Sequence, residues 1–175
     1  MASASKRRIP MTVTFLEMNA KPTALPPPQP RGKVALLRAE KPPTHFYRYL
    51  YDTIGNDYYW VDRRKLGPEA LTQLIHDPLN QLFVLYADGN PAGMAELDFR
   101  KSGSCNISYF GLMPEAIGRR LGFFFLYHTC INAWLQPIAR LTINTCTLDH
   151  PRALPLYQRM GFRPYDRQER FVELP

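Results

Sequence analysis

The chain has 175 residues, a length typical of one domain with a sizeable core, and 45% of them are hydrophobic. No run approaches about 20 apolar residues, which excludes a membrane-spanning helix. Lys6-Arg7-Arg8 is not followed by an apolar segment, so no secretion signal is expected. The net charge of +7 suggests a nucleic-acid-binding protein, but its distribution argues against one. Residues 1–41 hold eight Lys or Arg against two Glu, whereas the remainder is nearly neutral with 14 basic and 13 acidic residues.

Residues 1–33 are expected to form a basic, proline-rich extension before a globular domain at 34–175. The first ten residues have the composition of a disordered segment, and residues 12–18 are a candidate for an extra strand. Five prolines between residues 22 and 30 favour an extended linker.

The first half of the domain alternates strand and helix patterns. Residues 34–40 predict a strand, followed by a helix that begins at Thr44 and ends at Gly55, an aromatic loop at 58–64 and a helix that begins at Pro68. The residues expected to face the core are Phe46, Tyr49, Leu50 and Thr53 in the first helix and Leu71, Leu74 and Ile75 in the second.

The second half begins with a meander. Strands are expected at 81–87, 92–100 and 105–112, joined by turns at 88–91 and 101–104. The pattern then predicts a helix at 118–136, a strand at 140–148, a helix at 151–160 and strands at 162–165 and 169–174.

The most informative motif lies near the C-terminus. Four residues at i, i+3, i+4 and i+7 share one helical face, Gly161 ends the helix, and Phe162 starts an extended run. The spacing A-x-x-L-Y-x-x-x-G-F resembles the last motif of the GCN5-related N-acetyltransferase (GNAT) superfamily. The four residues are Ala153, Leu156, Tyr157 and Met160.

A second motif precedes it. A β-rich stretch ends at Pro114, and a glycine-containing loop with two arginines leads into an apolar helix, which suits the binding of an anion. The loop resembles the GNAT pyrophosphate loop Q/R-x-x-G-x-G/A, with Ile117 at the Gln/Arg position, Arg120 in place of the first glycine and Gly122 as the last. Gly118, Arg119 and Leu121 fit its common Gly-Arg-Gly-Leu-Gly form.

The resemblance implies an α/β (α+β) fold: a single domain with a central mixed, mostly antiparallel sheet of about six to seven strands and about four flanking helices. It implies acetyl-CoA as cosubstrate, with its pyrophosphate against Ile117–Gly122 and its pantetheine arm along the strand edge at Phe110, Gly111 and Leu112. Gly111 suits either a β-bulge or the end of the strand. Tyr157 is the expected general acid, and the alternative is a tyrosine of the core.

The general base is expected on the strand at 92–100. Glu96 and Asp98 share one face of an otherwise apolar strand, which makes them candidates for a water-filled site, with Glu96 as base and Asp98 as a substrate contact. The alternative is a polar strand face in solvent. His150 is expected to bond the pantetheine arm or to cap the helix, and Asp149 to cap it.

The acceptor side is expected at the first two helices and the aromatic loop, where Trp60 and Asp62 could bind an amine, although Trp60 could equally anchor the core. The three cysteines and four histidines lack metal-ligand spacing, so reduced thiols, no metal and a cytoplasmic location are expected. The leading hypothesis is an N-acetyltransferase for a primary amine of a small molecule or peptide. The alternative is a non-catalytic acyl-CoA-binding or regulatory protein. Many relatives dimerise, which leaves a homodimer open.

Overall fold

The computed structural model describes residues 7–174, which form one seven-stranded mixed sheet with four α-helices. The strand order is β2-β3-β4-β5-β6-β1-β7, and neighbours are antiparallel except for β5 and β6, which run parallel. This arrangement confirms the expected fold class. The strands are β1 (Arg8–Met18), β2 (Val34–Ala39), β3 (Asn80–Ala87), β4 (Asn90–Asp98), β5 (Ser104–Leu112), β6 (Arg140–Cys146) and β7 (Arg163–Glu173).

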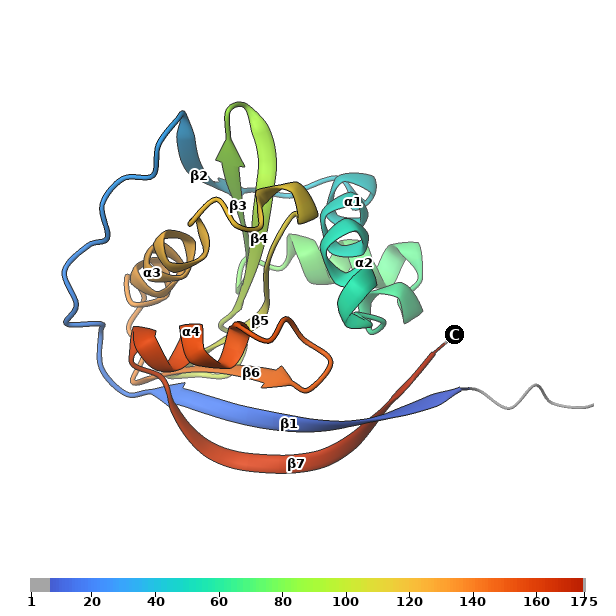
Figure 1. Ribbon diagram of the computed structural model, residues 1–175. Coiled ribbons are helices and arrows are strands. Elements are labelled where there is room, and N and C mark those ends of the chain that lie inside the picture. Colours follow the sequence, from blue (N-terminus) through green and yellow to red (C-terminus); the bar gives the residue numbers. More distant parts are fainter. Residues whose placement is uncertain (1–6, 175) are drawn as a thin grey trace, which may run out of the picture.

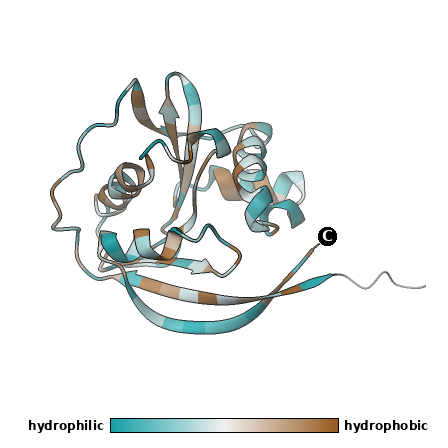
Figure 2. Cartoon of the chain, viewed as in Figure 1, coloured by the Kyte–Doolittle hydropathy of each residue, from teal (hydrophilic) through white to brown (hydrophobic). Residues whose placement is uncertain are grey.

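Two helices cover each face of the sheet, with α1 and α2 on one side and α3 and α4 on the other (Figure 1). They are α1 (Thr44–Gly55), α2 (Pro68–His76), α3 (Gly122–Ala133) and α4 (Ala153–Met160), and three short 3₁₀ turns are η1 (Asn56–Tyr58), η2 (Arg63–Lys65) and η3 (Pro114–Ala116). Because α3 contacts both β5 and α4, it is apolar on most of its surface (Figure 2). No helix within residues 7–174 is long and apolar enough to cross a membrane.

The feature that opens the sheet is a change of pairing along β5. This strand pairs with β4 as far as Leu112 but with β6 only from Ser104 to Ile107. The register against β4 shifts at Ser108, the extra residue of a β-bulge, which increases local twist. The two parallel strands therefore separate, and residues 108–112 keep an unpaired edge on the β6 side.

Gly111 does not form that bulge. It pairs in register with Met94, and a Cβ atom at Gly111 would lie 2.5 Å from Cγ2 of Ile54. The glycine therefore serves a close approach of α1 to β5 one residue before the strand ends, and the expected bulge at this residue is wrong.

The N-terminal segment is more structured than expected. Residues 1–6 lie outside the described part, but β1 already begins at Arg8 and lies between β6 and β7 in the sheet. Thus the segment expected to be an extension with a possible extra strand supplies an interior strand of the sheet. Residues 19–33 contain no helix or strand and run outside the domain from β1 to β2 (Figure 1).

Three further expectations were wrong in detail. The helix predicted at 118–136 begins only at Gly122, and the two predicted C-terminal strands are one strand, β7, that pairs along β1 with a single irregularity. The inward face of α1 is rotated from the expected one, so that Tyr49 is exposed. The buried residues of α1 are Tyr47, Leu50, Tyr51, Ile54 and Gly55.

Candidate active site

A cleft of about 500 Å³ opens where β5 and β6 separate. Tyr109 and Phe110 of β5, Ala153 and Tyr157 of α4, and the loop between η1 and η2 line it, and the ends of β1 and β7 complete its wall. The helix of the C-terminal motif and the unpaired edge of β5 therefore meet at one hollow, although they are far apart in the sequence.

Tyr157 lies on the inward face of α4 that the spacing predicted, and it also lines the cleft. Its ring contacts the rings of Phe110 and Phe162 edge to face, with centroids 6.2 and 6.3 Å away. Burial, followed by the charge of Asp149, raises the pKa of Tyr157 well above its ordinary value. The phenol therefore remains protonated at neutral pH and can act as a proton donor.

The loop before α3 has a left-handed backbone at two positions, one of which is the arginine that stands at the first glycine of the motif. Gly118 and Arg120 have φ values of 85° and 61°, in the left-handed region that favours glycine. The first turn of α3 has no side-chain cap, and a Cβ at Gly122 would come no closer than 3.7 Å to another residue. Free backbone N–H groups and open space are what an incoming phosphate requires.

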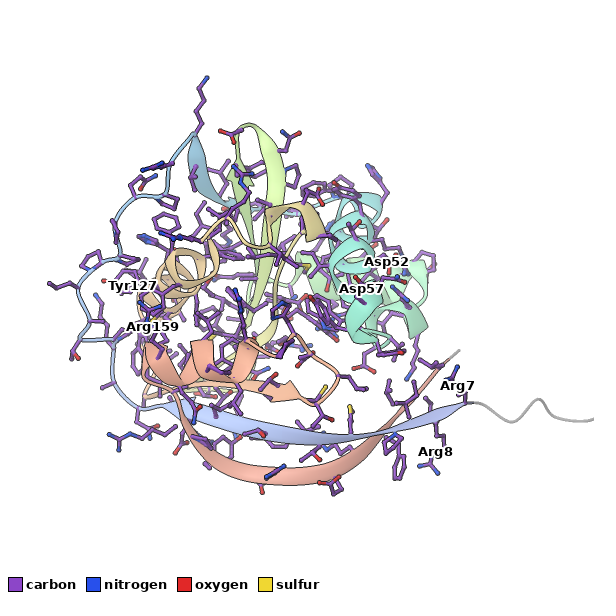
Figure 3. All side chains as sticks on the ribbon, viewed as in Figure 1. Arg7, Arg8, Asp52, Asp57, Tyr127 and Arg159 are labelled. Carbon is purple, nitrogen blue, oxygen red and sulfur yellow. The ribbon has the colours of Figure 1, made fainter. Side chains whose placement is uncertain are left out.

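The two arginines of this loop have different environments. The guanidinium of Arg119 donates to Asp88 at 2.8 Å, which ties the loop to the turn between β3 and β4. Arg120 is exposed at the left-handed position. On the other side, Arg159 of α4, which is labelled in Figure 3, lies over the ring of Phe123 at 4.2 Å and so joins α4 to the first turn of α3. Arg120 is therefore the better placed of the two to reach a bound anion.

Asp149 and His150 occupy the turn before α4. Asp149 accepts hydrogen bonds from the hydroxyl of Thr145 and the N–H of Cys146, both at 2.8 Å. It therefore fastens the end of β6 and does not cap α4 as expected. His150 lines the cleft, and its Nδ1 accepts the N–H of Arg152 at 3.2 Å, so it caps the turn while its ring faces Tyr58 at 6.5 Å.

Glu96 is fully buried, with 0% exposure, and not in the water-filled site that its position suggested. One carboxylate oxygen accepts the guanidinium of Arg63 at 2.5 Å, and the other accepts the hydroxyl of Tyr47. Burial, followed by the charge of Glu96, raises the pKa of Tyr47. The ion pair compensates the burial of a charge in the apolar strand. Because its side chain has no exposed surface and already accepts hydrogen bonds from Arg63 and Tyr47, Glu96 is poorly placed to accept a proton from an amine.

The partners of Glu96 were not predicted from the sequence. The backbone N–H of Arg63 donates to the hydroxyl of Tyr51 at 3.2 Å, and that hydroxyl lies 3.3 Å from the hydroxyl of Tyr109. The guanidinium of Arg63 lies 5.0 Å from the centroid of the Tyr109 ring. The available signal was the second helical face of α1, since Tyr47, Tyr51 and Ile54 also recur at helical spacing.

Of the three predicted acceptor residues, two lie at the cleft and one lies elsewhere. Trp60 and Asp62 line the cleft, and the ring of Trp60 contacts those of Tyr51 and Tyr109 in tilted arrangements, with centroids 5.4 and 4.8 Å apart. Asp98 does not line it. It accepts two hydrogen bonds from the guanidinium of Arg100, at 2.9 and 2.6 Å, and one from its backbone N–H, at 3.0 Å. It lies beside a different hollow, so the structure does not bring it together with the other two.

These features fit acetyl-CoA, the cosubstrate that the sequence motifs imply. The unpaired edge of β5 at Phe110, Gly111 and Leu112 offers backbone groups to an extended arm, and the turn from Ile117 to Gly122 offers an anion site at the start of α3. Within residues 7–174, no cluster of three His, Cys, Asp or Glu side chains could hold a metal ion.

A search of curated proteins gave no match. The model of the Acetyltransferase (GNAT) family matches residues 47–162, which is more than half of the chain. Among solved structures, a GCN5-related N-acetyltransferase from Kribbella flavida aligns with a TM-score of 0.61 at 18% identity, covering 88% of this chain and 56% of the other.

Two smaller neighbours are covered more completely. An aminoglycoside acetyltransferase from an uncultured soil metagenomic sample, in complex with sisomicin, aligns with a TM-score of 0.59 at 10% identity, over 73% of this chain and 87% of the other. An IAA acetyltransferase from Bacillus cereus aligns with a TM-score of 0.57 at 17% identity, over 77% and 79%. At such identities the likeness shows the fold alone. The chain spans only 52–63% of the length of the Kribbella protein and of four further matching structures.

Proposed function

Because this chain belongs to the GNAT family of acetyltransferases, we propose that it transfers the acetyl group of acetyl-CoA to a primary amine. The observation that carries the proposal is the meeting of the unpaired β5 edge and Tyr157 in one cleft, with an open helix N-terminus nearby for the pyrophosphate. The acceptor would be an amine on a small molecule or a peptide.

Binding of acetyl-CoA would use two parts of the chain. Backbone groups at Phe110–Leu112 would pair with the pantetheine arm as an added strand would. The N–H groups of the turn from Ile117 to Gly122 would hold the pyrophosphate, with Arg120 adding a positive charge and Arg119 keeping the loop in place through Asp88. His150 would contact the arm from the α4 side of the cleft.

In the chemical step, the chain supplies a proton and positions the amine. When bound, acetyl-CoA supplies a thioester whose carbon–sulfur bond breaks as the amide carbon–nitrogen bond forms. Tyr157 would donate its phenolic proton to the departing sulfur, since its raised pKa keeps it protonated. Because Glu96 is buried and paired with Arg63 and Tyr47, the proton that the amine loses would pass to water, and the phenolate of Tyr157 would regain a proton from water. We therefore propose that Glu96 positions Arg63 and Tyr47, in place of its predicted role as general base.

Two measurements test this proposal: thermal unfolding with CoA, and release of free thiol from acetyl-CoA in the presence of a panel of primary amines. Free ligand at 100 times its Kd should stabilise the protein by about 2.7 kcal/mol. Absence of any CoA-induced shift in a well-folded sample would overturn the cofactor assignment.

Gly122→Val sharpens the test of the cofactor loop. A Cβ at Gly122 meets only ordinary contacts, so the variant should fold, while its branched side chain blocks the approach of a phosphate. Gly67→Val is the matched control, because Gly67 precedes α2, which lies on the face of the sheet opposite α3 (Figure 1). A Cβ at Gly67 would have no other residue within 4 Å. The CoA-induced shift should disappear in Gly122→Val and persist in Gly67→Val.

The second candidate function is a non-catalytic acyl-CoA-binding protein. The observation that favours it is the engagement of both Glu96 oxygens, which leaves no free carboxylate at that position. Stabilisation by CoA without thiol release for any amine of a broad panel would support this alternative over the enzyme.

A further inference from the structure

Aromatic rings form the acceptor end of the cleft. Tyr58, Tyr59 and Trp60 come from the segment after α1, and Tyr109 comes from β5. Trp60 and Tyr109 contact each other with centroids 4.8 Å apart, and each contacts Tyr51 of α1 behind them, at 5.4 and 4.9 Å. These four cleft-lining residues are called the ring wall below.

The ring wall is fastened from behind by the buried polar network. Arg63 follows the wall in the chain, and its guanidinium is held by Glu96 at 2.5 Å while its N–H donates to the hydroxyl of Tyr51 at 3.2 Å. The same hydroxyl lies 3.3 Å from that of Tyr109. The network therefore joins the loop, α1, β4 and β5, and it holds the rings in place before any ligand binds.

The backbone of the wall is also constrained. Tyr59 has φ 57° and ψ 38°, a left-handed conformation that is costly for a bulky side chain. The N–H of Trp60 donates to the carbonyl of Gly55 at 3.0 Å, and a Cβ at Gly55 would lie 2.4 Å from that of Trp60. Strained residues of this kind cluster where ligands are clamped. The strain here keeps the half-exposed Tyr59 ring at the cleft.

Charge and size limit what this end of the cleft can hold. The side chain of Asp62 is 73% exposed and has a distant partner in Lys65, at 3.7 Å. A carboxylate beside ring faces attracts a primary ammonium group. The cleft of about 500 Å³ must also hold the acetylated end of the cosubstrate, which leaves room for a small molecule only.

We propose that the acceptor is a small primary amine with a flat, aromatic body: the ring wall binds the body and Asp62 attracts the ammonium group. This inference rests on the acetyl transfer proposed above. The rings of the wall are already ordered before binding, so they lose little conformational freedom when a ligand binds. An aromatic amine gains ring–ring contacts with them that an aliphatic amine lacks, so the wall favours the aromatic amine.

The test compares thiol release from acetyl-CoA with 2-phenylethylamine, 2-cyclohexylethylamine and ethylamine. Burial of the phenyl ring should raise kcat/KM about 100-fold over ethylamine, and the cyclohexyl compound should lie between them. Equal rates for phenylethylamine and ethylamine would overturn the inference while leaving acetyl transfer intact. If CoA binds and no amine releases thiol, both the transfer and this inference fall.

Variants of the wall provide a second test. Tyr59→Gly removes a ring but accepts the left-handed backbone, so it should fold at least as well as the wild type and lose about 10-fold of the preference for phenylethylamine. Trp60→Leu should reduce the preference more, with folding checked by the CoA-induced thermal shift. Asp62→Asn should raise KM for both amines by about 2- to 5-fold.

Tyr165→Leu is the matched control, since the Tyr165 ring is similarly exposed, at 48%, but does not line the cleft. It should leave the preference unchanged. A preference for phenylethylamine that survives in both Tyr59→Gly and Trp60→Leu would show that other parts of the cleft bind the amine, and would overturn the assignment of the ring wall.

Discussion

Replacing Arg120 by glycine should change stability and cofactor affinity in opposite directions. Arg120 has φ 61°, and the left-handed conformation costs an L-residue about 1–2 kcal/mol. Glycine avoids that cost but loses about 0.5–1 kcal/mol more conformational entropy on folding. The net expectation is a gain of about 0.5–1 kcal/mol, or a rise in Tm of about 1–4 °C for a domain of this size.

The same substitution should weaken CoA binding. An arginine at this position can form a charge-assisted hydrogen bond with a phosphate, which contributes about 1.5–3 kcal/mol, so the Kd measured by calorimetry should rise at least about 10-fold. Arg120→Lys is the control, because it keeps the charge and the backbone strain and should match the wild type in Tm.

Two outcomes would refute this reasoning. Equal or tighter CoA binding by Arg120→Gly would show that the Arg120 side chain points away from the phosphate. An unchanged or lower Tm would show that the left-handed conformation is not strained in this loop. Only a higher Tm with weaker binding agrees with both parts of the argument.

Three further predictions follow from the structure. Tyr157→Phe should lower kcat by about 10²–10⁴-fold with little change in CoA affinity. The kcat of the wild type should not fall up to about pH 10, because burial raises the pKa of Tyr157. Full activity of the variant would show that Tyr157 only packs in the core. The hydrogen bond from Arg100 lowers the pKa of Asp98 in the folded state, so the pair stabilises above about pH 4 and this stabilisation is lost as the pH falls through the folded pKa. Asp98→Asn should therefore lower Tm at about pH 7 and by less at about pH 2.5, and an equal loss at both would contradict the pairing. Gly111→Ala should destabilise the protein by about 1–3 kcal/mol, because its Cβ would lie 2.5 Å from Cγ2 of Ile54. The double variant with Ile54→Ala should lose less stability than the sum of the two single losses, because Ile54→Ala removes the clash. Purely additive losses would contradict the clash.

The cofactor side of the candidate site could be read from the sequence because it depends on local backbone. Gly118, the loop before α3 and the spacing of Tyr157 on α4 lie within short segments whose glycines and helical periodicity determine their conformation. The departure at Arg120 was visible as well, and the structure adds its cause, a left-handed φ.

The acceptor side could not be read in the same way. The sequence of α1 supports two neighbouring helical faces, and only its packing on the sheet turned Tyr47 and Tyr51 inward and left Tyr49 exposed. Likewise Glu96 and Asp98 are two residues apart on one face of β4, and the sequence does not distinguish the two carboxylates. Their different environments arise from partners elsewhere: Arg63, which is distant in the chain, and Arg100, which lies on the next turn.

The sequence by itself determined the order of the strands and helices between β2 and α4, the glycine-containing loop before α3 and the helix that presents Tyr157, because each follows from residues close together in the chain. Only the tertiary structure decided that β1 enters the sheet between β6 and β7, that β5 and β6 separate beyond Ile107, and that Glu96 is occupied by Arg63. Each of these depends on contacts between distant segments, whose burial and hydrogen bonding are settled when the whole sheet is assembled.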